Sequence, residues 1–182
     1  MDSKTGILYL VSTPIGNLGD ITFRAIETLK KVKVIAAEDT RHSKRLLNHY
    51  GIITPLLSYY EYNRDVRIPK IIEIIKSGDS VSLISDAGTP AISDPAYKLV
   101  RSAIENKIKI ESVPGASAVL ASLIPSGLPT DRFVFEGFLP NKKGRKKRIE
   151  SMKNEIATII LYESPKRLIR TLRQLCEVLG DR

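Results

Sequence analysis

Short apolar runs alternate with longer amphipathic stretches from residue 7 to residue 113 of this sequence. Between neighbouring runs, apolar residues such as Ile68, Ile71 and Ile75 recur every three or four positions, which is typical of a helix with one buried face. Strands that alternate with such helices favour a mostly parallel sheet covered on both faces. We therefore predict an α/β fold. The predicted buried strands are residues 7–11, 32–37, 55–60, 80–85 and 108–113.

The segment at residues 128–131 is rich in turn-forming residues and marks the predicted domain boundary. After it, residues 133–139 and 156–162 are predicted strands, each followed by a predicted helix. We predict an N-terminal α/β domain at residues 1–127 and a smaller α/β domain at residues 128–182. Two strands and two helices make a thin layer, so we expect the second domain to be truncated, without its later strands.

A wide loop of small residues follows the predicted strand that ends at Ser85. It contains Asp86 and Gly88 and leads to Asp94 and Pro95, which have the residue types preferred at the N-cap and first position of a helix. The loop is ten residues long, against about 2–6 for most such connections. Because ligands of open α/β sheets bind at the carboxyl ends of the strands, the loop predicts a ligand site. A strand-to-helix connection without a ligand is the alternative.

Two more polar loops, at residues 12–20 and 38–43, also follow predicted strands. Because parallel strands end at a common edge, we expect the three loops to converge. Glu38 and Asp39 are candidate general bases, and Arg41 is a candidate phosphate ligand. The alternative is that these three side chains form a structural ion-pair network.

Positive charge is concentrated in the last part of the chain. The net charge is +9, and residues 113–182 carry 13 basic against 7 acidic side chains. Such an asymmetry indicates a polyanionic partner, for which a dense basic run would supply a mobile, phosphate-binding segment. We expect the first half of this run to be a loop and its second half to start a helix through Met152. A solvated basic surface is the alternative. The candidate RNA-binding residues of this run are Lys142, Lys143, Arg145, Lys146, Lys147 and Arg148.

The single cysteine, Cys176, excludes an internal disulfide. It shares a predicted helical face with Leu168 and Leu172, which predicts a core position. His42 and His49 have no ligand spacing around them, so we expect no protein-held transition metal. The sequence contains no apolar run of membrane-spanning length, and its first residues do not resemble a signal peptide, so we expect a cytoplasmic protein.

Six motifs, in this order, resemble those of the tetrapyrrole methylase superfamily, whose members transfer methyl groups from S-adenosylmethionine. Within it they are most similar to bacterial enzymes that methylate the ribose 2′-oxygen of a cytidine in the decoding region of 16S ribosomal RNA. Ala96 and Lys166 stand where that pattern has glycine and histidine. The motifs are T-P-I-G-N-L-G-D at 13–20, A-E-D-T-R-H-S at 37–43, S-D-A-G-T-P-A-I-S-D-P at 85–95, V-P-G-A-S-A at 113–118, G-F-L-P at 137–140 and Y-E-S-P at 162–165.

The resemblance implies that S-adenosylmethionine binds between the two domains, that the substrate is small-subunit ribosomal RNA, and that the protein is a homodimer. Asp86 would meet the positive charge of the cofactor, or else act as a turn residue. Methylation of a tetrapyrrole intermediate and a non-catalytic, ribosome-associated RNA-binding module are the alternative functions. The residues implied to border the cofactor are Pro14, Asp86, Gly88, Thr89, Pro90, Ile92, Ser117, Ala118 and Tyr162.

Overall fold

The computed structural model describes residues 5–93 and 96–180 of the 182. These residues form two compact units that divide between Ala118 and Val119. The helix start expected at Asp94 and Pro95 lies outside the described residues.

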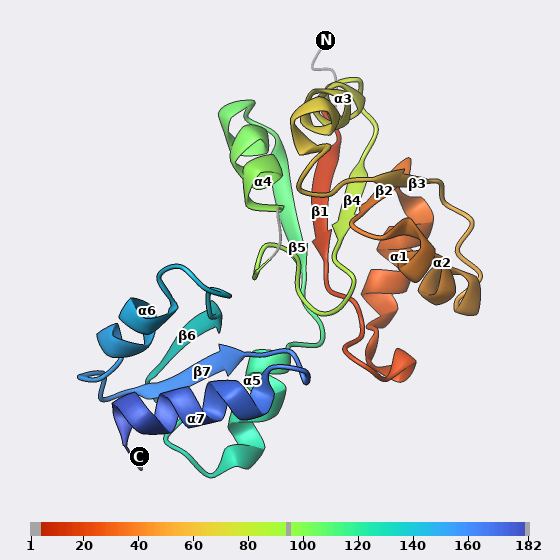
Figure 1. The fold of residues 1–182 in the computed structure, drawn as a ribbon. Coiled ribbons are helices and arrows are strands. Elements are labelled where there is room, and N and C mark those ends of the chain that lie inside the picture. The colour runs from red at the N-terminus through yellow and green to blue at the C-terminus, as the bar shows by residue number, and fades with distance from the viewer. Residues whose placement is uncertain (1–4, 94–95, 181–182) are drawn as a thin grey trace. The chain divides into compact units, whose positions relative to one another are not determined.

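The first unit is built on a five-stranded sheet with the order β3-β2-β4-β1-β5 (Figure 1). All four neighbouring pairs are parallel. The prediction of an α/β fold with a mostly parallel sheet is therefore confirmed. The strands are β1 (Ile7–Val11), β2 (Val34–Ala37), β3 (Leu56–Ser58), β4 (Val81–Ile84) and β5 (Lys109–Val113).

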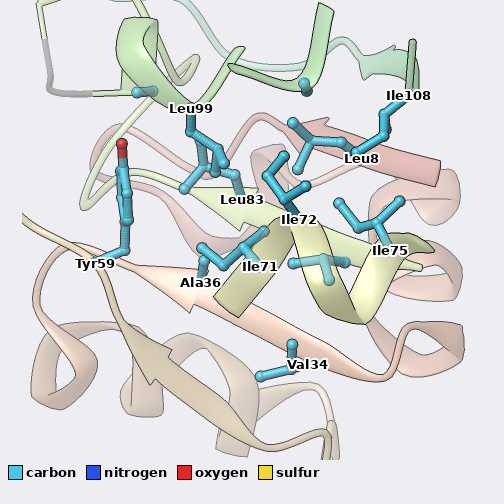
Figure 2. Packing of buried hydrophobic residues seen from close by; sticks show 13 residues of the cluster. Leu8, Val34, Ala36, Tyr59, Ile71, Ile72, Ile75, Leu83, Leu99 and Ile108 are labelled. Carbon is cyan, nitrogen blue, oxygen red and sulfur yellow. The ribbon is translucent and has the colours of Figure 1, made fainter. Parts of the chain in front are cut away.

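Helices cover both faces of this sheet because the central strands are apolar on both sides. On β2, Val34 and Ala36 pack in one cluster, whereas Ile35 and Ala37 pack in the other, as the two-residue period of a strand requires. One cluster includes helices α3 and α4, and the other includes α1 and α2. Figure 2 shows the first of these clusters. The helices are α1 (Phe23–Lys31), α2 (Thr40–His49), α3 (Arg64–Lys76) and α4 (Ala96–Glu105), with a short 3-10 helix η1 (Leu18–Asp20).

The second unit contains two parallel strands and three helices. Val119 and Leu123 of the first helix pack against Ile160 of β7, so this helix belongs with the second unit. The structure thus divides the chain after Ala118, the first residue of this helix, earlier than the boundary expected at 127/128. The elements are α5 (Ala118–Leu123), η2 (Ile124–Ser126), β6 (Phe133–Phe138), α6 (Arg145–Ser151), β7 (Thr158–Tyr162) and α7 (Leu168–Leu179).

Helix α7 buries only part of the apolar face that the sequence predicts. Leu175 packs with the cluster that contains Leu139 and Ile149, but Leu168 and Leu172 are about half exposed. Cys176 is exposed, so its predicted core position is wrong. None of the helices in the described part of the chain is long and apolar enough to cross a membrane.

Candidate functional site

The loops that follow β1 and β4 are joined directly at the carboxyl edge of the first sheet. The Thr13 N–H donates to the Gly88 carbonyl at 2.9 Å, and the Gly88 N–H donates to the Thr13 carbonyl at 3.1 Å. Gly88 has a φ of +80°, a conformation that favours glycine. Because β1 and β4 are neighbours in the sheet, two loops more than seventy residues apart in sequence become one surface.

The loop after β5 packs on the same surface. The Ser12 and Thr89 hydroxyls are 3.0 Å apart, and the Thr89 hydroxyl donates to the Ala116 carbonyl at 3.5 Å. A Cβ on Gly115 would lie 2.9 Å from the Ser12 Cβ, so only glycine fits this approach. Ser117 is half-buried beside this contact.

The loop after β2 is tied to the same edge through Asp86. Its Oδ1 accepts a hydrogen bond from the Asp39 N–H at 3.1 Å. The structure therefore gives Asp86 a partner on a neighbouring loop. The expected convergence is observed for the loops after β1, β2 and β4.

Asp39 is the N-cap residue of α2. Its Oδ1 accepts from the Arg41 N–H at 2.8 Å and from the His42 N–H at 3.4 Å. The backbone hydrogen bond from Arg41, followed by the hydrogen bond from the Arg41 side chain, lowers the pKa of Asp39 below its usual range. The Arg41 side chain is 91% exposed and lies 3.4 Å from the carboxylate. These two residues therefore combine a helix cap with an exposed ion pair, and Glu38 is exposed beside them.

A pocket of about 410 Å³ opens among these loops, within the size range of small-molecule sites. Two of the expected cofactor neighbours, Pro14 and Asp86, line this pocket. His42 and Arg45 of α2 line it as well, together with apolar residues such as Ile15 and Leu46. Arg45 follows His42 by three residues and so shares its helical face, a signal that the sequence analysis did not use. The pocket is lined by Thr13, Pro14, Ile15, Gly16, Leu18, His42, Ser43, Arg45, Leu46, Ile84, Ser85, Asp86 and Ala87.

The second half of the loop after β4 is strained. Ala91 and Ser93 have φ values of +71° and +137°, which L-residues rarely adopt. Pro90 is buried and Ile92 is 46% exposed. Strain of this kind clusters at ligand sites, where the surrounding structure over-determines the backbone.

Two further expected cofactor neighbours are Ala118, the last residue of the first unit, and Tyr162 of the second unit. Ala118 begins α5 and is half-buried. Tyr162 ends β7, and its ring centroid lies 4.8 Å from that of Phe135 and 5.5 Å from that of Phe138. Burial raises the pKa of the Tyr162 hydroxyl.

The basic run separates into exposed and buried cations. Lys142, Lys143, Lys146 and Lys147 are exposed. Arg148 is exposed as well, but one guanidinium nitrogen lies 2.6 Å from the Glu136 carboxylate. These five side chains remain on the surface of the second unit.

Arg145 differs from its neighbours because it is only 5% exposed. Its Nε donates to the Gln174 side-chain oxygen at 2.7 Å, and its Nη1 donates to the Pro140 carbonyl at 3.1 Å. Its Nη2 donates to the Thr171 hydroxyl at 2.5 Å and lies 3.5 Å from a Glu163 oxygen. The RNA contact expected of Arg145 is therefore corrected to an internal structural role, since long-range partners bury this guanidinium.

Glu163 is the centre of that buried network. Its Oε1 accepts from the Ser164 N–H at 2.8 Å and lies 2.7 Å from Arg167 Nη2, and its Oε2 accepts from the Thr171 hydroxyl at 2.7 Å. Desolvation acts to raise the pKa of Glu163, but the hydrogen bonds from Thr171 and Ser164 and the charge of Arg167 outweigh it and lower that pKa.

Comparison with known proteins shows the family of this chain. Residues 7–182 match the family model of the Tetrapyrrole (Corrin/Porphyrin) Methylases. A Synechocystis protein named ribosomal RNA small subunit methyltransferase I is 53% identical over 177 residues, which are 97% of this chain and 63% of that protein. A Thermotoga maritima protein of the same name is 49% identical over 177 residues, 97% of this chain and 80% of that one.

Solved structures share the fold at much lower identity. A cobalt precorrin-4 methyltransferase aligns with a TM-score of 0.71 at 15% identity, over 94% of this chain and 74% of its own. At that identity the likeness concerns the fold alone. The chain spans less than two thirds of the Synechocystis relative.

Proposed function

Because this chain belongs to the tetrapyrrole (corrin/porphyrin) methylases, we propose that it methylates small-subunit ribosomal RNA with S-adenosylmethionine as methyl donor. We propose a ribose 2′-oxygen of a cytidine in the decoding region as the target. The supporting observation is about 50% identity, over nearly all of the chain, to two proteins named ribosomal RNA small subunit methyltransferase I. The exposed lysines of the second unit fit a polyanionic substrate.

The residues of the first unit fit the cofactor chemically. When bound, S-adenosylmethionine supplies an electrophilic methyl group, and it offers a carboxylate, an ammonium, a sulfonium and an adenine for recognition. The Asp86 carboxylate lines the pocket and suits a positive charge. The apolar walls, with Pro14 and Ile15, suit an adenine or an alkyl chain. We propose that the cofactor is bordered in the first unit by Pro14, Asp86, Gly88, Thr89, Pro90, Ile92, Ser117 and Ala118. The family resemblance implies the same role for Tyr162.

The chain's own contribution to the chemistry is to hold the ribose and to accept its proton. Asp39 is a weak base because its hydrogen bonds lower its pKa. Glu38 is exposed directly after β2 and is the other candidate for a proton acceptor on this loop. Arg41 projects into solvent from the same loop and suits a phosphate of the substrate.

Methyl transfer is tested with the purified chain, S-adenosylmethionine labelled in its methyl group, and small ribosomal subunits. We expect label in the ribosomal RNA at a nucleotide that resists alkaline cleavage, because a 2′-O-methyl group blocks attack on the neighbouring phosphate. A parallel reaction with precorrin substrates examines the tetrapyrrole alternative. RNA binding without any transfer would support the non-catalytic module.

Asp86→Ala provides the matched variant for cofactor binding. Loss of a charged partner should weaken S-adenosylmethionine binding about tenfold or more, as measured by calorimetry. Asp65→Ala removes an exposed carboxylate outside the pocket and should leave the affinity unchanged. Equal affinities of wild type and the Asp86 variant would remove Asp86 from the cofactor site.

We also propose that the protein acts as a homodimer in the cytoplasm. The family resemblance supports the dimer, and a ribosomal substrate supports the compartment. Sedimentation velocity at micromolar concentration checks the dimer, and a monomer would contradict it.

A further inference from the structure

A second hollow lies on the surface of the second unit, between the end of β6 and helix α6. It has a volume of about 540 Å³. Phe138 and Pro140 form its apolar part, and Lys147 and Arg148 form its basic part. This hollow is separate from the pocket of the first unit and shares no residue with it.

A β-bulge places Phe138 in this hollow. Residues three apart on a regular strand point to opposite faces. The register of β6 shifts between Phe135 and Gly137, however, and Gly137 has a φ of +61°. The extra residue turns Phe138 to the side of Phe135, so both rings contact Tyr162. Bulges that re-aim a side chain in this way are common beside functional sites.

The ring of Phe138 is supported from one side and open on the other. It meets the Tyr162 ring at a centroid distance of 5.5 Å and an interplanar angle of 59°. Even so, 54% of the residue is exposed. A large exposed aromatic held by a second ring is already ordered, so a planar ligand can stack on it at little cost in side-chain entropy.

The hollow is also lined by Glu136, which holds one of its two cations. Arg148 lies 2.6 Å from Glu136, whose side chain is 13% exposed, so the guanidinium is fixed while about half of its side chain stays accessible. Lys147 precedes it on α6 and is exposed. An aromatic face beside fixed positive charge is the combination that binds single-stranded nucleic acid, with bases stacked and phosphates paired.

We propose that this hollow binds one unpaired nucleotide of an RNA strand, with its base stacked on Phe138 and its flanking phosphates on Lys147 and Arg148. The inference rests on the proposed RNA substrate and adds a base-binding subsite to it. A free phosphate would need the cations alone, and an apolar protein segment would not need them. The exposed ring and the positive charge together favour a nucleotide.

Fluorescence anisotropy with a labelled oligocytidylate measures the subsite directly. An abasic ribose-phosphate strand of the same length is the second probe, because it offers the charges without the bases. Phe138→Ala should weaken binding of oligocytidylate roughly 5- to 150-fold, as expected for the loss of one stacked base. It should leave binding of the abasic strand unchanged, and Phe138→Trp should restore the affinity for oligocytidylate.

Phe133→Ala is the matched control, since Phe133 is a 39% exposed aromatic on the same strand that does not line the hollow. It should change neither affinity. Equal weakening of both probes by Phe138→Ala, or no weakening of either, would refute the subsite. If ribosomal subunits are methylated but Phe138→Ala affects the binding of oligocytidylate and of the abasic strand equally, only this inference fails. If Phe138→Ala weakens the binding of oligocytidylate alone but no methyl group is transferred to ribosomal subunits, only the proposed activity fails.

Discussion

Replacing Arg145 by Met should destabilise the protein far more than replacing any of the lysines around it. Arg145 is the buried member of the basic run, with three hydrogen-bond acceptors and the Glu163 carboxylate around its guanidinium. Met has a similar length but no donor, so Arg145→Met leaves the Gln174 oxygen and the Pro140 carbonyl without their partner. Removing one member of a buried ion pair typically costs about 3–5 kcal/mol.

The surroundings of Glu163 place the expected cost near the lower end of that range. After the substitution, Glu163 still accepts hydrogen bonds from Thr171 and Ser164 and keeps its ion pair with Arg167. The remaining charge is therefore not left isolated. We expect the free energy of unfolding to fall by about 3 kcal/mol.

Urea denaturation followed by circular dichroism measures this difference. Lys146→Met is the matched control, because the Lys146 side chain is 85% exposed and its ion pair with Glu150 spans 3.9 Å. Such a surface pair contributes about 0–1 kcal/mol. If Arg145→Met and Lys146→Met cost the same within about 1 kcal/mol, the buried network does not stabilise the second unit. A double substitution with Glu163→Gln should then show no coupling either.

Two other predictions concern charge. The pKa of Glu163 is lowered in the folded state. The stabilising contribution of its carboxylate is therefore present above its ordinary pKa of about 4.3 and is lost as the pH falls through the lower folded value. The stability difference between wild type and Glu163→Gln, measured by urea denaturation, should shrink below about pH 4.3. Replacing Lys142, Lys143, Lys146 and Lys147 by Gln should weaken binding to ribosomal RNA. In a salt titration, the slope of the logarithm of the binding constant against the logarithm of the salt concentration should flatten by roughly three units, and the affinity for S-adenosylmethionine should not change. An unchanged slope would show that these lysines are only a solvated surface.

The sheet and the meeting of its loops were predictable because both follow from local patterns. Apolar runs of strand length identify β1, β2 and β4, and parallel strands bring their carboxyl ends to one edge. The sequence does not reveal which backbone groups join the loops. The bridge from Thr13 to Gly88 depends on the strand order, which places β1 beside β4.

The burial of Arg145 was not predictable from its neighbourhood. It stands among exposed lysines, and its partners Glu163, Thr171 and Gln174 are 18 to 29 residues further along the chain. The helix predicted for the second half of the run is confirmed and begins at Arg145 itself, but its presence does not say which cation is buried. Similarly, the apolar stripe of α7 has the right period, but periodicity alone does not say which apolar side chains are covered.

The position of the Phe138 side chain was not predictable from the sequence for a related reason. Counting by two along β6 places Phe135 and Phe138 on opposite faces, and one inserted residue reverses that result. Gly137 is the only local sign, because glycine inside a predicted strand indicates a bulge or a close approach.

For the methyl transfer proposed above, the pKa values of Asp39 and Glu163 favour catalysis by positioning. Asp39 caps a helix and Glu163 holds two arginines, and both have lowered pKa values, so both are weak proton acceptors. In a methyl transfer from a sulfonium, the departing sulfur is neutral and needs no acid. A general base contributes about 10²–10⁴-fold, equivalent to about 3–5 kcal/mol at 1.36 kcal/mol per tenfold, whereas orientation of the reactants contributes about 7–11 kcal/mol. Acidic side chains that order the residues around them, Asp39 within the first unit and Glu163 within the second, therefore serve the larger of the two effects.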